Sequence, residues 1–270
     1  MRFSKWHGLG NDYLLIERAD GAGLLTSTLV ARLCDVHRGV GADGVLEVTS
    51  TEGGRADLVI WNPDGSQAEL SGNGTRIAAR WLARRTGLAE VVVAVGPRRV
   101  HATMRGGLLV EQDLGPVTVG PPEAVEINGM PVAFTPVDVG NPHAVVEREP
   151  ERSMLLELGP LLERHPRFPR RTNVQLVRVD GPGEITVRVW ERGVGETMSS
   201  GTSATAAAAA VIESGRCAGP VRVHLPGGDL EVALDARSHG LLTGPAQEIC
   251  AGEVSSELLA EASGDQTATP

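Results

Sequence analysis

Lysine is almost absent from this chain of 270 residues, in which Lys5 is the single lysine among 25 basic residues. Pyridoxal-phosphate enzymes hold their cofactor as a Schiff base on a lysine. Only Lys5 could carry it, and it lies just before the tight stretch Gly8-Leu9-Gly10. A pyridoxal enzyme is therefore not expected.

Basic blocks, long apolar runs and metal-ligand clusters are also missing. The 25 basic and 34 acidic residues give a net charge of −9, which argues against nucleic acid or an anionic membrane as the main partner. No apolar run approaches the roughly 20 residues of a membrane span. The N-terminus has no hydrophobic signal region, so a cytoplasmic protein is expected. Cys34, Cys217 and Cys250 lie far apart without metal-ligand spacing, and no metal is expected.

Aromatic residues make up only 3% of the chain, so aliphatic side chains must fill the core. Short β-rich runs alternate with glycine-rich turns and helical patterns. Strands are predicted at 57–61, 91–95, 107–111, 185–190, 221–225 and 230–234, and helices at about 28–37, 75–85, 153–163 and 203–213. The proline-rich segment 115–136 is the best candidate for a domain boundary. Residues 252–270 are expected to form a disordered tail.

A weak internal repeat suggests two like halves. In the first half, Val59-Ile60-Trp61-Asn62 precedes a polar turn, and Ser71-Gly72-Asn73-Gly74-Thr75 then opens a helix. In the second half, Val187-Arg188-Val189-Trp190-Glu191 precedes a glycine-rich turn, and Ser200-Gly201-Thr202-Ser203 opens a helix. Each helix is followed by a strand, a glycine turn and another strand.

The two Ser-Gly turns are candidate anion sites. A small polar residue and a glycine before a helix leave backbone N–H groups unpaired, and the helix dipole favours negative charge there. Asn73 and Thr202 add side-chain donors or caps. Ordinary N-capping explains either turn alone. Two turns at equivalent places in a repeat could grip one carboxylate between two helix N-termini. Behind the first turn, the residues expected to be able to reach a surface are Arg76, Arg80, Arg84 and Arg85.

Several further motifs resemble those of the diaminopimelate epimerases. The opening Met1-Arg2-Phe3-Ser4-Lys5-Trp6-His7-Gly8-Leu9-Gly10-Asn11-Asp12-Tyr13 is similar to the start of that family. The other matching motifs follow in the family's order: Gly39-Val40-Gly41-Ala42-Asp43-Gly44, Asn62-Pro63-Asp64-Gly65-Ser66, Gly140-Asn141-Pro142-His143, Glu191-Arg192-Gly193-Val194-Gly195-Glu196-Thr197, Leu225-Pro226-Gly227-Gly228 and Thr243-Gly244-Pro245-Ala246. The resemblance runs from residue 1 to about residue 250.

The resemblance implies an α/β (α+β) fold of two pseudo-symmetric domains. Each would be a β-barrel-like sheet around a central helix, with the active site in the cleft between them. On this basis the expected domains are 1–116 and 117–251, followed by the tail 252–270.

The resemblance also implies an isomerase that interconverts LL- and meso-diaminopimelate in lysine biosynthesis, without a cofactor. One cysteine thiolate removes the α-proton from one face, and a second cysteine thiol returns a proton to the other. Carried over by position, the expected substrate-binding residues are Asn11, Asn62, Gly72, Asn73, Asn141, Asn173, Glu191, Arg192, Gly201 and Thr202. The expected catalytic residues are Ser71 and Ser200, with His143 and Glu191 tuning the acid–base pair. The resemblance therefore implies that the two serines face each other across one cleft.

The sequence departs from the family at the two cysteine positions, which are Ser71 and Ser200. A thiol needs only a modest pKa shift to ionise near neutrality, whereas a serine hydroxyl is far more basic and needs its own base. Three explanations fit. In the first, both cysteines were replaced to block turnover. In the second, the chain is a natural variant in which water, His143 or Glu191 transfers the proton. In the third, the chain binds an amino acid with little turnover. The natural variant is slightly favoured, because the serines sit in smooth local contexts.

Two rival functions stay open at this point. One is an amino-acid-binding relative with little turnover, which the serine pair favours. The other is an isomerase or dehydratase of the same superfold acting on another substrate, where carboxylates can replace thiols. The expected partner is a small-molecule amino-acid substrate, not nucleic acid or a membrane, with a homodimer as the candidate assembly.

Overall fold

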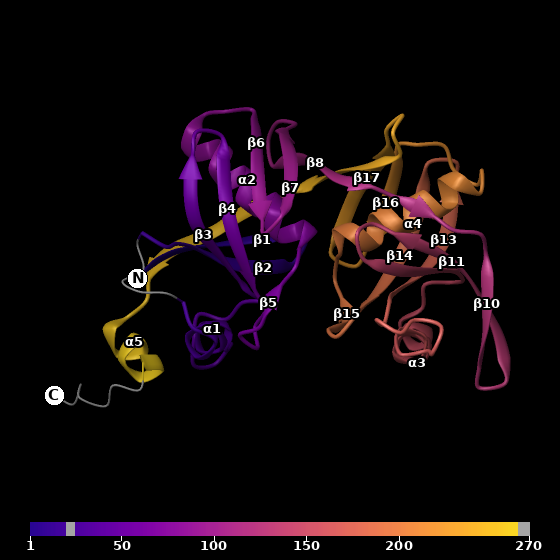
Figure 1. Ribbon diagram of the computed structural model, residues 1–270, viewed down its shortest axis with the longest axis horizontal. Helices are drawn as coiled ribbons and strands as arrows, with labels where there is room; N and C mark the ends of the chain where they lie inside the picture. Colours follow the sequence, from indigo (N-terminus) through magenta and orange to yellow (C-terminus); the bar gives the residue numbers. More distant parts are fainter. Residues whose placement is uncertain (20–24, 264–270) are drawn as a thin grey trace. The chain divides into compact units, whose positions relative to one another are not determined.

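The computed structural model describes residues 1–19 and 25–263. The chain divides into two units, of which unit 1 holds Met1–Val110 and the described residues from Pro245 onward, and unit 2 holds Glu111–Gly244. Figure 1 shows α2 surrounded by the strands of unit 1, and α4 surrounded by those of unit 2. Within the described ranges, no helix is both long and apolar enough to cross a membrane.

The strands of unit 1 pair in the order β19-β1-β2-β3-β4-β6-β7, with β5 beside β4. Their bounds are β1 (Arg2–Gly8), β2 (Asn11–Glu17), β3 (Val45–Glu52), β4 (Arg55–Trp61), β5 (Gln67–Ala68), β6 (Glu90–Val95), β7 (Arg98–Met104) and β19 (Gln247–Glu253). The helices are α1 (Ser27–Cys34), α2 (Gly72–Thr86) and α5 (Ser256–Ser263). Because α2 contacts β1, β2, β4, β6 and β7, it forms the centre of the unit.

The strands of unit 2 pair in the order β11-β12-β13-β14-β16-β17-β18, with β9 and β10 beside β11 and β15 beside β14. Their bounds are β9 (Thr118–Val119), β10 (Glu123–Ile127), β11 (Met130–Asp138), β12 (Pro142–Glu147), β13 (Asn173–Gly181), β14 (Glu184–Glu191), β15 (Gly195–Thr197), β16 (Val221–Leu225) and β17 (Gly228–Leu234); β8 (Leu109–Pro116) and β18 (His239–Pro245) run across the unit boundaries. The helices are α3 (Arg152–Glu163) and α4 (Gly201–Glu213).

The predicted central helices are confirmed, and each suits its place. In α4 a run of alanines lets strands approach from all sides, and its residues from Gly201 to Val211 are buried. In α2 the apolar face packs into the core of unit 1, and Gly87 ends the helix at φ 76°. The strand predicted at 107–111 begins only at Leu109, because Gly106 and Gly107 adopt positive φ in the preceding turn.

The predicted internal repeat appears as a shared topology. The pairs β1–β2 and β11–β12 are antiparallel, β2–β3 and β12–β13 are parallel, and β4–β6 and β14–β16 are parallel. The register agrees as well, since Val45 pairs with Trp61 just as Val174 pairs with Trp190. The central helices also lie at corresponding places along the chain. Helix α2 follows β4 and β5 and precedes the hairpin β6–β7, and α4 follows β14 and β15 and precedes the hairpin β16–β17.

The structure corrects the expected boundaries at residues 116 and 251. β19 pairs antiparallel with β1, so the last strand belongs to unit 1 and not to the second half of the chain. The expectation of a disordered tail over 252–270 is wrong for Ser256–Ser263, which form α5. This helix contacts α1, and Arg32 bonds Glu261 at 2.8 Å. Residues 264–270 lie outside the described residues.

A second correction concerns Arg76, which was expected to reach a surface. Its side chain is fully buried, and its guanidinium donates to the carbonyl of Pro245 at 2.9 Å and to Oδ1 of Asn73 at 2.8 Å. Burial lowers the pKa of Arg76 to about 10. Arg76 therefore orients the asparagine in the first turn of α2.

Candidate active site

Ser71 is the N-cap of α2 and lies at the centre of the polar groups in unit 1. Its Oγ accepts a hydrogen bond from the backbone N–H of Gly74 at 3.0 Å, as an N-cap side chain does. The phenol oxygen of Tyr13 lies 3.0 Å from the same Oγ. Ser71 is half-buried, whereas Gly72 and Asn73 are buried. The helix N-terminus thus ends in a hydroxyl that two other groups already hold in place.

Asn73 and Asn11 form a chain of side-chain amides beside this N-cap. Nδ2 of Asn73 donates to Oδ1 of Asn11 at 3.1 Å, and Nδ2 of Asn11 donates to Oδ2 of Asp43 at 3.0 Å. Burial raises the pKa of Asp43, and hydrogen bonds from the backbone N–H of Asp12 and the side chain of Asn11 oppose part of that rise. The structure thus brings Asn11, Asn73 and Ser71 together at one end of α2.

Asn62 follows β4 and is held mainly by its own turn. Its backbone N–H donates to the carbonyl of Ser66 at 2.8 Å, and its Nδ2 donates to Oγ of Ser66 at 2.9 Å. These bonds explain why Asn-Pro-Asp-Gly-Ser forms a compact turn. In the repeat, Asn62 follows Trp61 as Glu191 follows Trp190, so an amide and a carboxylate occupy corresponding strand ends.

Ser200 is the N-cap of α4, and its surroundings differ from those of Ser71. Its side chain makes no capping bond within the described residues, although Ser200, Gly201 and Thr202 are all buried. Its hydroxyl instead interacts with the carboxyl of Glu191. Burial raises the pKa of Glu191, and hydrogen bonding, including that with Ser200, opposes part of the rise. This carboxyl therefore has a stronger affinity for a proton than an exposed glutamate.

His143 is buried, and both of its ring nitrogens have protein partners. Nε2 lies 2.9 Å from Oδ1 of Asn141, and Nδ1 lies 3.0 Å from Nε2 of Gln175. An amide oxygen can only accept and an amide nitrogen can only donate, so His143 carries its proton on Nε2. Burial, followed by the charge of Arg192, lowers its pKa to about 3. His143 is therefore neutral near pH 7, and its geometry suits a positioning residue.

Asn173 connects three segments around the end of β13. Its Nδ2 donates to the carbonyl of Pro142 at 3.0 Å, and its Oδ1 accepts from the backbone N–H of Arg192 at 3.0 Å. The guanidinium of Arg192 donates to the carbonyl of Arg170 at 3.2 Å. Asn173 thus fixes the turn that carries Glu191 and Arg192.

Three residues near the site were not among those expected from the sequence. Tyr13 and Asp43 lie inside motifs that were recognised only as family matches, and Gln175 lies in β13, a strand that was not among those predicted from the sequence. Gln175 is fully buried and its Nε2 also donates to Oγ of Ser203 at 3.0 Å. A polar residue in a buried strand position was the signal available for Gln175.

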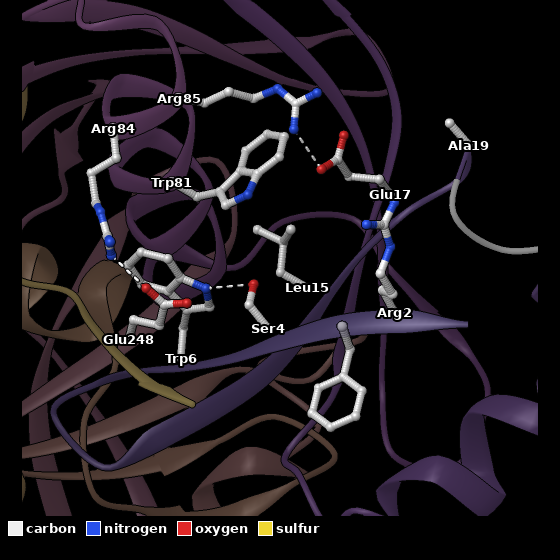
Figure 2. A pocket seen from close by; sticks show the side chains of 11 residues that line it. Arg2, Ser4, Trp6, Leu15, Glu17, Ala19, Trp81, Arg84, Arg85 and Glu248 are labelled. Atoms are coloured by element: carbon white, nitrogen blue, oxygen red, sulfur yellow. Dashed lines mark hydrogen bonds and ion pairs between the residues drawn. The ribbon is translucent and has the colours of Figure 1, made fainter. Parts of the chain in front are cut away.

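A pocket of about 540 Å³ lies in unit 1 but is not this site. Figure 2 shows it lined by Trp6, Trp81, Arg84 and Arg85, the last three from the later turns of α2. Arg84 bonds Glu248 at 2.5 Å and Arg85 bonds Glu17 at 2.7 Å. Arg84 and Arg85 are thus paired with carboxylates of the pocket lining, and Ser71 and Asn73 lie at the opposite end of the helix. Among the residues the structure describes, no cluster of three or more His, Cys, Asp or Glu side chains could hold a metal ion.

The fold of this chain is shared with solved structures that include a predicted epimerase and a probable proline racemase. A predicted epimerase from Pseudomonas aeruginosa aligns with a TM-score of 0.70 and 15% identity, covering 94% of this chain and 99% of that one. This likeness shows the fold alone.

The particular family follows from sequence. The family model for diaminopimelate epimerase matches residues 3–119 and 135–249. Diaminopimelate epimerases of Synechococcus elongatus and Moorella thermoacetica are 37% and 39% identical to this chain, covering 94% of it and 98% and 99% of their own lengths. The chain belongs to the diaminopimelate epimerase family, and it is an isomerase of that type.

Proposed function

We propose that this protein interconverts LL- and meso-diaminopimelate by removing and returning the α-proton, as a step of lysine biosynthesis. The observation that carries the proposal is the paired environment of the serines at the N-termini of α2 and α4. Each is joined to a titratable group, Ser71 to the phenol of Tyr13 and Ser200 to the carboxyl of Glu191. The names of the relatives support the choice of substrate.

The binding role rests on backbone and amide donors. The first turn of a helix offers unpaired N–H groups and a positive dipole end, both of which favour a carboxylate. The residues proposed to bind the substrate are Asn11, Asn62, Gly72, Asn73, Asn141, Asn173, Glu191, Arg192, Gly201 and Thr202. Arg76 and Asn11 support this role, because they hold the amide of Asn73 in one orientation.

The proposed proton-transfer residues are Ser71 and Ser200. Glu191 would exchange the proton of Ser200, since the two side chains interact and burial raises the pKa of that carboxyl. His143 would orient this region through Asn141 and Gln175. That both serines act on the same α-carbon is part of the proposal and comes from the family resemblance.

We also propose that the reaction needs neither pyridoxal phosphate nor a metal. The ammonium of Lys5 bonds the carboxylate of Asp12 at 2.7 Å and donates to the carbonyl of Gly41 at 2.7 Å. An amine that makes both of these contacts is not free to form a Schiff base with a cofactor. Unchanged activity after exhaustive dialysis against a chelator, with no absorbance of a bound pyridoxal, would support this part of the proposal.

A deuterium wash-in experiment tests the function. The purified protein is incubated in D₂O with LL- or meso-diaminopimelate, and loss of the α-proton signal is followed by NMR. The proposal predicts exchange with both isomers, and thermal stabilisation by both. Stabilisation without exchange would instead identify an amino-acid-binding relative. If the protein shows neither exchange nor stabilisation with either isomer, diaminopimelate is not its substrate.

The remaining expectations are a cytoplasmic location, no binding of nucleic acid, and a homodimer as the candidate assembly. Cell fractionation, a gel-shift measurement and light scattering coupled to gel filtration would test them in turn.

A further inference from the structure

Tyr13 occupies a position that the proposed function does not yet use. It lies in β2 with its side chain 8% exposed, packed in the core that surrounds α2. A Cβ at Gly44 would lie 2.4 Å from the carbonyl oxygen of Trp61 and 2.7 Å from Cε1 of Tyr13, so both the strand and the ring leave room only for glycine there. The ring is thus fixed, and its single polar atom lies 3.0 Å from Oγ of Ser71.

The hydroxyl of Ser71 has one hydrogen and two lone pairs. One lone pair accepts the N–H of Gly74 at 3.0 Å. If Tyr13 donates to the second lone pair, the hydrogen of Ser71 is directed elsewhere and can be given away. If Ser71 donates to the oxygen of Tyr13, one lone pair is left to receive a proton. The bond between Tyr13 and Ser71 is thus compatible with the serine acting as a proton donor or as a proton acceptor.

The acidity of the phenol explains why this matters. A serine that loses its proton alone becomes a strongly basic alkoxide, whereas an ordinary tyrosine ionises with a pKa near 10. The positive end of α2 lies beside the pair and favours a negative charge there. A serine coupled to a phenol can therefore release a proton without itself retaining the negative charge.

We propose that Tyr13 is a positioning residue that holds and refills the proton exchanged by Ser71, an inference that rests on the proposed function. In the donating direction, the α-carbanion's electron pair forms a new C–H bond with the proton of Ser71. The electrons of the broken O–H bond stay on Oγ, which takes the proton of Tyr13 and leaves a phenolate. One negative charge thus moves from carbon to the phenol oxygen. The opposite direction reverses each transfer.

Other titratable and charged groups lie on the elements that carry or adjoin the pair. Lys5 and His7 lie on β1, Asp12 on β2, Asp43 and Glu47 before and on β3, and Arg76 on α2. Lys5 is paired with Asp12, and Glu47 accepts from Arg18 at 2.8 Å and from Nε1 of Trp61 at 3.1 Å. A pH profile of the whole enzyme would mix these groups, so the test must observe Tyr13 itself.

The composition provides that observation, because Tyr13 is the only tyrosine of the chain. Growth of a tyrosine-auxotrophic host on 3-fluorotyrosine labels this position alone. The ¹⁹F chemical shift then reports the pKa of the phenol, without any need for turnover. The labelled parent and a labelled Ser71→Ala variant are compared. The proposal predicts different phenol pKa values in the two proteins, and equal values would overturn it.

Activity provides the second part of the test. Tyr13→Phe removes one oxygen, keeps the ring, and is expected to lower α-proton exchange by roughly 10²–10⁴-fold with little change in KM. In the fluorotyrosine protein, the phenol-dependent limb of the pH–rate profile should shift by as much as the ¹⁹F titration shifts. Thr75→Val is the matched control, because it removes a buried hydroxyl of the same helix turn that donates to the carbonyl of Ser71 at 2.9 Å. Its exchange rate should be close to that of the parent.

The outcomes separate this inference from the proposed function. Normal exchange by Tyr13→Phe would overturn the role of Tyr13 and leave the epimerase function standing. A parent that exchanges no α-proton would refute the proposed function and the catalytic use of Tyr13 together. In that case, a phenol pKa that differs between the parent and Ser71→Ala would show that the Tyr13–Ser71 bond exists and has a structural role only.

Discussion

The N-termini of α2 and α4 occupy equivalent places in two units of the same topology, yet their serines are held differently. Ser71 caps its helix and contacts a phenol, whereas Ser200 makes no capping bond in the described part of the chain and interacts with a carboxyl. A phenol is normally protonated near pH 7, and a carboxyl is normally ionised. The difference indicates that one fold, used twice, can provide an acid at one position and a base at the other.

Replacing both serines by cysteine would abolish this difference and has the largest expected effect. A thiol can give and take a proton near neutral pH without a helper. Ser71→Cys combined with Ser200→Cys is expected to raise α-proton exchange by roughly 10²–10⁴-fold. Either single change should recover little, because inversion needs an acid on one face and a base on the other. If the parent already exchanges the α-proton as fast as the double variant, the serines do not limit the rate of exchange.

Glu191→Gln tests the carboxyl at the second N-terminus. If the carboxylate takes the proton of Ser200, exchange should fall by roughly 10²-fold or more. Because burial raises the pKa of Glu191, folded protein binds more protons than unfolded protein at pH values just above the ordinary glutamate pKa. The contribution of Glu191 to the free energy of unfolding therefore falls as pH rises through that window. The variant should therefore melt at a higher temperature than the parent at pH 7. Lower exchange together with a lower melting temperature would indicate simple damage to the fold.

The proposed binding of a carboxylate at the N-termini of α2 and α4 should give a smaller effect, which should also differ between the two helices. Asn73→Ala and Thr202→Ala should each weaken diaminopimelate binding by about 1–2 kcal/mol through loss of a hydrogen bond to a charged group. The loss at Asn73 should be the larger, because Arg76 and Asn11 orient its amide. Titration calorimetry measures both values. Unchanged affinity in both variants would count against anion capture at these turns.

The smallest effect concerns the pH dependence of stability. His143 is neutral when folded, and its pKa is lowered to about 3 from an ordinary value near 6.5. Unfolded protein therefore binds more protons than folded protein between these values, and stability should fall as pH drops through this window. His143→Gln should flatten that part of the curve in urea melts at pH 4 to 7. An identical slope in parent and variant would show that His143 does not cause the loss.

The sequence indicated the elements and the repeat, because capping turns and glycine positions are local signals. It could not show that Tyr13 lies beside Ser71, because these residues are far apart in the sequence. They meet only when the sheet that contains β2 packs around α2. The return of β19 to β1 and the burial of Arg76 are tertiary outcomes of the same kind. The motifs predicted Asn11, Asn73, Glu191 and the two serines as site residues, whereas Gln175 was not among the residues predicted from the sequence.

The central claim, that two different groups act on the two faces of one carbon, is tested most directly by the position of solvent deuterium early in the reaction. LL-diaminopimelate is incubated with the parent protein in D₂O, and substrate and product are separated and analysed by mass spectrometry. Since one group removes the proton and another supplies the deuteron, the account predicts deuterium in the meso product and almost none in the recovered LL substrate. Equal early labelling of both isomers would show a single exchanging base and would contradict the account.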